Sequence, residues 1–199
     1  STLTASILAA MGSAHAATIN VVDSCTLVDA IQAANTDAVV GSCTAGLGDD
    51  VIQVVTPDSN ITISTVFSPS AVGPGNTGLP TITSNVTIEG NGMTLQSANY
   101  AVDNFRLLEV GPMGDLTLRD APVQNADDGH GVGSGLMSDG GRVSSENSTF
   151  ALNNGAIYLT NSLNNEINNS VIRHNTQTGG NAAGLTTYFA GVEINSSSI

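Results

Sequence analysis

An irregular eight-residue repeat constrains the fold of this chain more than any other feature. It occurs five times, at offsets of 30, 27, 22 and 27 residues. The third position is apolar in four copies, the exception being Ser145, while the fifth is always a turn former and the eighth is always apolar. The copies start at Val86, Leu116, Val143, Asn165 and Val192, their fifth positions are Gly90, Asp120, Asn147, Asn169 and Ser196, and their eighth positions are Met93, Val123, Phe150, Ile172 and Ile199.

Each copy has the pattern of a strand, a bend and the start of a second strand. Residues two apart in a strand point to the same side, and the residue after the bend points back into the same interior. Stacked coils of this kind bury a continuous aliphatic column, so we expect Ile88, Leu118, Ile167 and Ile194 to share one column. Unequal spacing within the range of solenoid repeats favours an all-β, parallel β-helix over a propeller. Asparagines at the bends are expected to form a hydrogen-bond ladder.

One short helix is predicted before the repeats. Leu27, Ala30, Ile31 and Ala34 recur at helical spacing. Thr26 and Asp29 resemble a capping box, and Asn35 is the expected stop. The apolar stripe of this helix is expected to cover the open hydrophobic end of the first coil.

The first 16 residues are interpreted as the remnant of a secretion signal. Ile7–Met11 is the tail of an apolar stretch, and Ala14-His15-Ala16 fits the small-x-small pattern of a cleavage site. The alternative is an ordinary N-terminal turn. Neither this stretch nor any later one reaches the roughly 18 apolar residues of a membrane helix.

Two cysteines, Cys25 and Cys43, follow the signal remnant. In an exported chain, an isolated pair most simply forms one disulfide, and two buried free thiols are the alternative. A zinc site is improbable because two cysteines without a nearby histidine do not complete four ligands.

The charge of the chain excludes some partners. It has 17 acidic residues against four arginines and a net charge of −13. A nucleic-acid or anionic-membrane partner requires a cationic surface that this chain does not have the residues to build. Arg106 and Arg119 are expected on solvated faces or as stacking partners.

A glycine-rich segment, residues 125–141, is the best candidate for a site. We interpret it as a structural loop, with Asp127, Asp128 and Asp139 as weak candidate ligands for Ca²⁺. Otherwise no metal, cofactor or catalytic residue is predicted. Asp49-Asp50 is interpreted as a solvated turn and His174 as a surface turn residue.

Several segments together resemble a known group. They are Cys25–Ile31, Gly41–Gly46, Asp49–Ile52, Gly78–Ser84, Val86–Gly92, Phe105–Leu108 and Gly114–Leu118. The chain thereby resembles exported bacterial β-helix proteins with a CSLREAI-type N-terminal domain, related in style to polymorphic outer-membrane proteins and adhesin-like passengers. It has Thr-Leu-Val-Asp where the motif has Ser-Leu-Arg-Glu. The resemblance implies a helical cap pinned by Cys25–Cys43 on a right-handed β-helix, and supplies no catalytic residues.

These observations predict three regions: a signal remnant at 1–16, a cap at 17–50 and β-helix coils at 51–199 that continue beyond Ile199. The expected protein is exported to the extracellular space or outer cell surface. It is a non-catalytic, adhesin-like scaffold whose polar face and loops bind glycans or cell-surface partners. The alternative is a carbohydrate-active β-helix enzyme, a polysaccharide lyase or a glycoside hydrolase.

Overall fold

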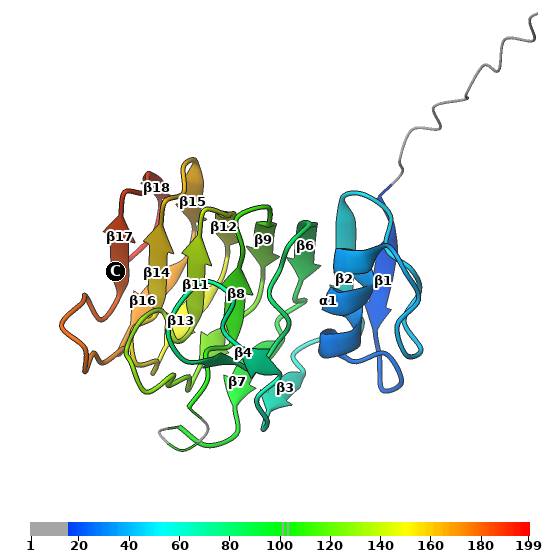
Figure 1. The fold of residues 1–199 in the computed structure, drawn as a ribbon, viewed down its shortest axis with the longest axis horizontal. Coiled ribbons are helices and arrows are strands. Elements are labelled where there is room, and N and C mark those ends of the chain that lie inside the picture. The colour runs from blue at the N-terminus through cyan, green and yellow to red at the C-terminus, as the bar shows by residue number, and fades with distance from the viewer. Residues whose placement is uncertain (1–15, 101, 103) are drawn as a thin grey trace, which may run out of the picture.

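The structure is a computed structural model that describes residues 16–100, 102 and 104–199. Most of the predicted signal remnant, residues 1–15, therefore lies outside the described residues. The described chain is almost entirely β-structure with one short helix (Figure 1). The all-β class and the capping helix are confirmed.

Three parallel sheets form the walls of the solenoid. Sheet 1 has seven strands, in the spatial order β1 (Thr18–Val21), β2 (Asp50–Val54), β6 (Asn85–Glu89), β9 (Asp115–Arg119), β12 (Arg142–Glu146), β15 (Asn165–Asn168) and β18 (Val192–Asn195). Sheet 2 has five, β3 (Asn60–Ile63), β7 (Thr94–Ser97), β10 (Val123–Gln124), β13 (Thr149–Ala151) and β16 (Val171–Arg173). Sheet 3 has four, β8 (Leu108–Val110), β11 (Leu136–Asp139), β14 (Ile157–Thr160) and β17 (Leu185–Tyr188).

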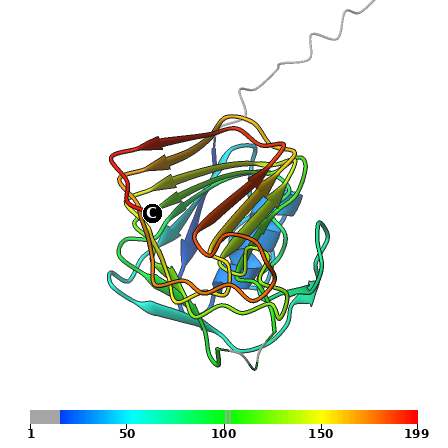
Figure 2. The same cartoon turned by 90° about the vertical axis from the view of Figure 1, so that its left-hand side faces the viewer.

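The coils wind in a right-handed sense. From β8 onward, each coil visits sheet 3, then sheet 1, then sheet 2. Seen from the C-terminal end, the last coil runs anticlockwise towards the viewer, from β17 through β18 (Figure 2). This is the hand expected of parallel crossover connections. A small antiparallel hairpin, β4 (Ser68–Pro69) with β5 (Asn76–Thr77), projects from the coil between β3 and β6.

The predicted column exists. Direct neighbours in sheet 1 run from Ile88 to Leu118, Ser145, Ile167 and Ile194. The polar exception, Ser145, is buried and its hydroxyl lies 3.2 Å from that of Ser170. A hydroxyl inside the column is therefore partnered by a hydroxyl from the next coil.

The bends follow the predicted positions in four copies of the repeat. Asp120, Asn147, Asn169 and Ser196 all have left-handed backbones, with φ of 47–50°, which Asn and Asp tolerate better than most residues.

The first copy of the repeat differs. There Asn91 (φ 53°), not Gly90, takes the left-handed conformation, and the turn is longer. As a result Leu95, rather than Met93, is the neighbour of Val123. The predicted alignment of Met93 is therefore wrong, although its side chain is buried.

The expected ladder of bend asparagines is also wrong. Asn147 and Asn169 are exposed, and the serine after each bend makes the stacked bonds instead. The Ser148 N–H donates to Ser170 Oγ at 3.2 Å, and the Ser170 N–H donates to Ser197 Oγ at 3.0 Å. The bend residue points outward, so only its successor faces the neighbouring coil.

The cap is built as predicted, apart from its end. Helix α1 (Leu27–Thr36) begins after Thr26, whose side chain accepts from the Asp29 N–H, and ends at Asp37 with φ 50°. Asn35 is thus not the stop. Its side chain instead donates to Thr81 O at 2.8 Å and accepts from the Thr83 N–H at 2.9 Å, which ties the helix to the coil.

The apolar side of α1 joins the buried core at the N-terminal end of the stack, beside β1 and β2 (Figure 1). A disulfide joins Cys25 and Cys43, as predicted, and both residues are buried. Cys25 precedes α1 and Cys43 follows it, so the disulfide joins the segments before and after the helix.

Candidate binding face and buried charge network

The outward side chains of sheet 1 form a polar surface that extends from β6 to β18. Alternation along each strand places apolar residues inside and polar residues outside. We call this surface the polar face. It consists of Asn85, Thr87, Glu89, Asp115, Thr117, Arg119, Arg142, Glu146, Glu166, Asn168, Glu193 and Asn195.

Arg119 occupies the centre of one column on the polar face. Its strand neighbours are Glu89 and Glu146. Nη1 lies 2.7 Å from Glu89 Oε1, and Nε lies 2.7 Å from Glu146 Oε2. These hydrogen bonds raise the pKa of Arg119 above its ordinary value. The prediction of a stacking partner is confirmed for this arginine.

Arg142 also binds two carboxylates, one directly beside it on β9 and one diagonally across from it on β15. Nη1 lies 3.2 Å from Asp115 Oδ1, and Nη2 lies 2.8 Å from Glu166 Oε1. Its Nε also donates to the carbonyl of Asn164 at 2.9 Å. Each arginine of the polar face therefore joins carboxylates from the coils before and after its own.

Towards the last strand, the polar face becomes acidic. Glu166 and Glu193 are direct neighbours on β15 and β18. Each accepts from an amide on its own strand, Glu166 from Asn168 at 3.2 Å and Glu193 from Asn195 at 3.1 Å. An open hollow of about 350 Å³ lies here, lined in part by both glutamates.

Asp50 corrects the prediction of a solvated Asp49-Asp50 turn. Asp49 is exposed and accepts from the Asn85 amide at 2.8 Å, but Asp50 is buried as the first residue of β2. Its Oδ1 accepts from the Leu47 N–H at 2.7 Å and the Ala17 N–H at 3.3 Å. Burial raises the pKa of the Asp50 carboxyl. The carboxylate anchors the loop that leads from the cap into the first coil.

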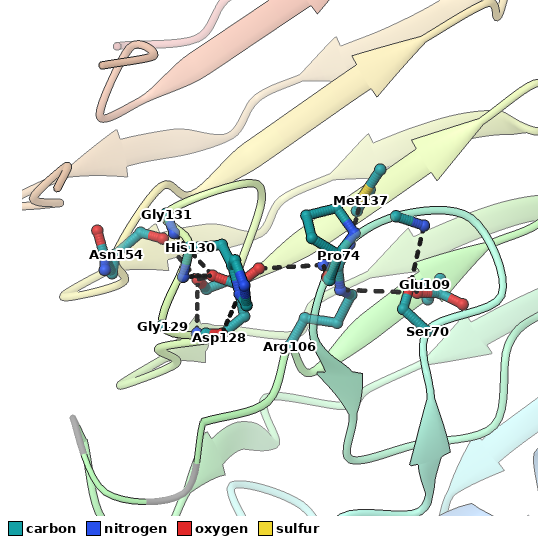
Figure 3. A network of polar contacts seen from close by, with 12 residues as sticks. Ser70, Pro74, Arg106, Glu109, Asp128, Gly129, His130, Gly131, Met137 and Asn154 are labelled. Carbon is teal, nitrogen blue, oxygen red and sulfur yellow. Dashed lines mark hydrogen bonds and ion pairs between the residues drawn. The ribbon is translucent and has the colours of Figure 1, made fainter. Parts of the chain in front are cut away.

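Arg106 also corrects a prediction, because it is neither solvated nor part of a stack. Its side chain is fully buried between Asp128 and Glu109, which are also buried (Figure 3). Nη2 lies 3.0 Å from Asp128 Oδ2, and Nε lies 3.6 Å from Glu109 Oε2. Burial lowers the pKa of Arg106, and the two carboxylates act against that shift.

Glu109 binds the segment that covers it. It lies on β8, where the alternation would point it outwards. It accepts from the Ala71 N–H at 2.9 Å, from Thr81 Oγ1 at 2.6 Å and from the Ser70 hydroxyl. Arg106 also donates to the carbonyl of Pro74. The hairpin segment 68–77 is thus fixed over sheet 3 by charged groups beneath it.

Asp128 organises the glycine-rich segment 125–141. Its Oδ1 accepts from the Gly131 N–H at 2.8 Å, the Ser134 hydroxyl at 2.9 Å and the His130 N–H at 3.0 Å. Its other oxygen faces Arg106. Both oxygens of this carboxylate therefore have protein partners, and the residue acts as the centre of a turn.

The other two candidate cation ligands have separate partners. Asp127 Oδ1 accepts from the Asn154 amide at 2.9 Å, and Asp139 Oδ1 accepts from the Asn161 amide at 2.8 Å. Within residues 16–199, excepting 101 and 103, no group of three or more His, Cys, Asp or Glu side chains is placed to hold a metal ion. Calcium binding by Asp127, Asp128 and Asp139 stays a prediction. His174 is exposed at a turn, as expected.

The sequence did carry a signal for the buried network. Arg106 lies between Phe105 and Leu107, and Glu109 lies between Leu108 and Val110, all four of which are buried. Charged residues inside a continuous apolar run indicate burial with a partner. The partner Asp128 and the covering hairpin are not recognisable from local pattern.

The fold and its surface define the chain as a right-handed parallel β-helix with a helical, disulfide-linked cap and a charged outer sheet. Comparisons with models of protein families, with curated proteins and with solved structures find no match. Among the described residues, no helix is both long and apolar enough to cross a membrane.

Proposed function

We propose that this chain is an exported, non-catalytic β-helix scaffold with an adhesin-like role, and that its polar face binds glycans or other cell-surface partners. The polar face carries the proposal. Parallel strands repeat its carboxylates, guanidiniums, hydroxyls and amides at about 4.8 Å intervals. Sugar hydroxyls both donate and accept hydrogen bonds, so a surface that presents both kinds of partner suits them.

The pairing of the charges supports binding rather than hydrolysis. A glycoside hydrolase works with two carboxylates that face each other across the scissile bond. On the polar face, Arg119 and Arg142 instead hold carboxylates from neighbouring coils in static ion pairs. Fixed groups of this kind orient a ligand without moving a proton.

Export is supported by the disulfide and by two predictions from the sequence. A disulfide persists in oxidising compartments, and Cys25–Cys43 links the cap. The predicted signal remnant and the resemblance to CSLREAI-type exported proteins agree with it. Attachment to the outer cell surface is part of the same proposal.

A panel of immobilised polysaccharides, with product analysis of each, tests the proposal. We expect retention of the wild-type chain on some members without release of reducing ends or unsaturated sugars. Thr117→Arg, in the middle of the polar face, is expected to weaken retention at least tenfold. Thr149→Arg on sheet 2 places the same bulk and charge elsewhere and is expected to bind like the wild type.

Three results would overturn it. Release of sugar products would assign a lyase or hydrolase instead. Equal weakening by Thr117→Arg and Thr149→Arg, or no retention on any member, would remove the polar face as a binding surface.

A further inference from the structure

A corner of the solenoid, between sheets 2 and 3, carries an unexplained leucine. Three successive coils leave sheet 2 through a left-handed residue: Asn125 (φ 59°), Leu152 (φ 59°) and His174 (φ 53°). Asn and His are enriched in this conformation, but Leu is not. Leu152 is also 48% exposed. Neither backbone preference nor burial accounts for it, and strained positions of this kind concentrate at ligand sites.

Tyr100 lies beside the same corner. It belongs to the loop after β7, yet its hydroxyl is 2.9 Å from Thr176 Oγ1, which follows β16. The hydrogen bond holds the tyrosine next to the stacked turn residues. Tyr100, Asn125, Leu152, His174 and Thr176 line one pocket of about 270 Å³. We call it the corner pocket.

The lining combines apolar groups with polar groups that form hydrogen bonds. The Tyr100 ring and the Leu152 side chain supply apolar surface, while Asn125, His174 and Thr176 supply an amide, an imidazole and a hydroxyl. Ligand sites commonly have this mixture of an aromatic wall and a few polar groups. No carboxylate is among these five residues, although the chain has 17 acidic residues. The chemistry favours a small neutral ligand with one apolar face and a hydroxylated edge.

We propose that the corner pocket binds a single neutral sugar ring of a glycan. The proposal rests on the proposed glycan-binding function and gives it a second, local site. The apolar face of the ring packs on Tyr100 and Leu152, and its hydroxyls bond to Asn125 and His174. The volume of about 270 Å³ lies just below the range of ligand pockets, roughly 300–1,000 Å³, so the pocket suits no more than one ring.

Titration of the wild-type chain with neutral sugars tests this inference. The probes are methyl glucopyranoside, methyl galactopyranoside and N-acetylglucosamine, followed by NMR shifts of Tyr100, Leu152 and His174. We expect saturable shifts with at least one sugar. Leu152→Asn is expected to weaken that binding at least fivefold while the midpoint of unfolding stays equal or rises, because Asn suits the left-handed backbone better.

Leu47→Asn is the matched control, since Leu47 is a leucine of the cap that is 49% exposed. It is expected to bind like the wild type. The inference is overturned if the sugars shift none of the three residues, or if Leu152→Asn and Leu47→Asn bind equally well. Failure of the proposed function is a separate result, because it is read from polysaccharide retention and from Thr117→Arg.

Discussion

The guanidinium of Arg106 lies 3.0 Å from the carboxylate of Asp128, and neither side chain is exposed to solvent. The two residues come from different insertions in the solenoid. Arg106 also bonds to the hairpin at Pro74, while Asp128 holds the glycine-rich segment at Gly131. One ion pair therefore links the hairpin segment to the glycine-rich segment.

Arg106→Ala is expected to lower the free energy of unfolding by about 3–5 kcal/mol, because it leaves two buried carboxylates without their cation. Urea unfolding followed by circular dichroism measures the loss. Arg119→Ala is the control, and its partly exposed ion pairs predict a loss of roughly 1 kcal/mol or less per pair. Equal losses in the two variants would show that the buried network does not stabilise the fold.

The raised pKa of Asp50 predicts a pH-dependent stability. A carboxyl whose pKa is higher in the folded chain than its ordinary 3.8 favours folding most at low pH, and this contribution disappears as pH rises through the folded value. The wild type is therefore expected to lose stability relative to Asp50→Asn as pH rises above about 4 towards 7. Urea unfolding of both proteins across that interval gives the difference. A difference that stays constant, or changes as much in Asp49→Asn, would contradict the assignment.

Removal of the Cys25–Cys43 disulfide is expected to lower the free energy of unfolding by about 3 kcal/mol, since the cross-link closes a loop between residues 18 apart in sequence. Unfolding midpoints of the wild type with and without reductant measure the effect. The Cys25→Ser, Cys43→Ser double variant should be insensitive to reductant and match the reduced wild type. Unchanged stability after reduction would show that the cap holds without the bond.

Truncation of two isoleucines in the same column is expected to reduce the stability of the fold by different amounts. Ile167→Ala is expected to lower the free energy of unfolding by about 2–5 kcal/mol, because Ile167 is 1% exposed and truncation of its side chain leaves a cavity. Ile194→Ala is expected to lower the free energy of unfolding by less than half as much, because Ile194 is 42% exposed. The comparison uses the same substitution at neighbouring positions, so thermal unfolding of both variants measures the effect of burial alone. Equal losses would contradict the described core.

Part of the polar face could be predicted from the sequence and part could not. Alternation along the strands indicated a polar outer side, and the repeat placed Arg119 in a stack. The pairing of Arg142 with Asp115 and Glu166 depends on which residues lie side by side in neighbouring coils. The repeat offsets of 30, 27 and 22 residues give this alignment only once the coils are known to stack. The left-handed conformation of Leu152 could not be predicted from the sequence, because it is seen only in the backbone of the structure.

The sequence by itself determined the column of Ile88, Leu118, Ile167 and Ile194, four of the five bends and the helical cap, because strand alternation, turn formation and helix periodicity act between residues close in the chain. Only the tertiary structure decided that Asp50 is buried and which distant groups pair with the buried Arg106 and Glu109. Strand alternation points Glu109 outwards, and the hairpin segment 68–77, about 30–40 residues away in the chain, covers it. The partners of a buried charge depend on which distant segment lies on top, and local pattern does not carry that information.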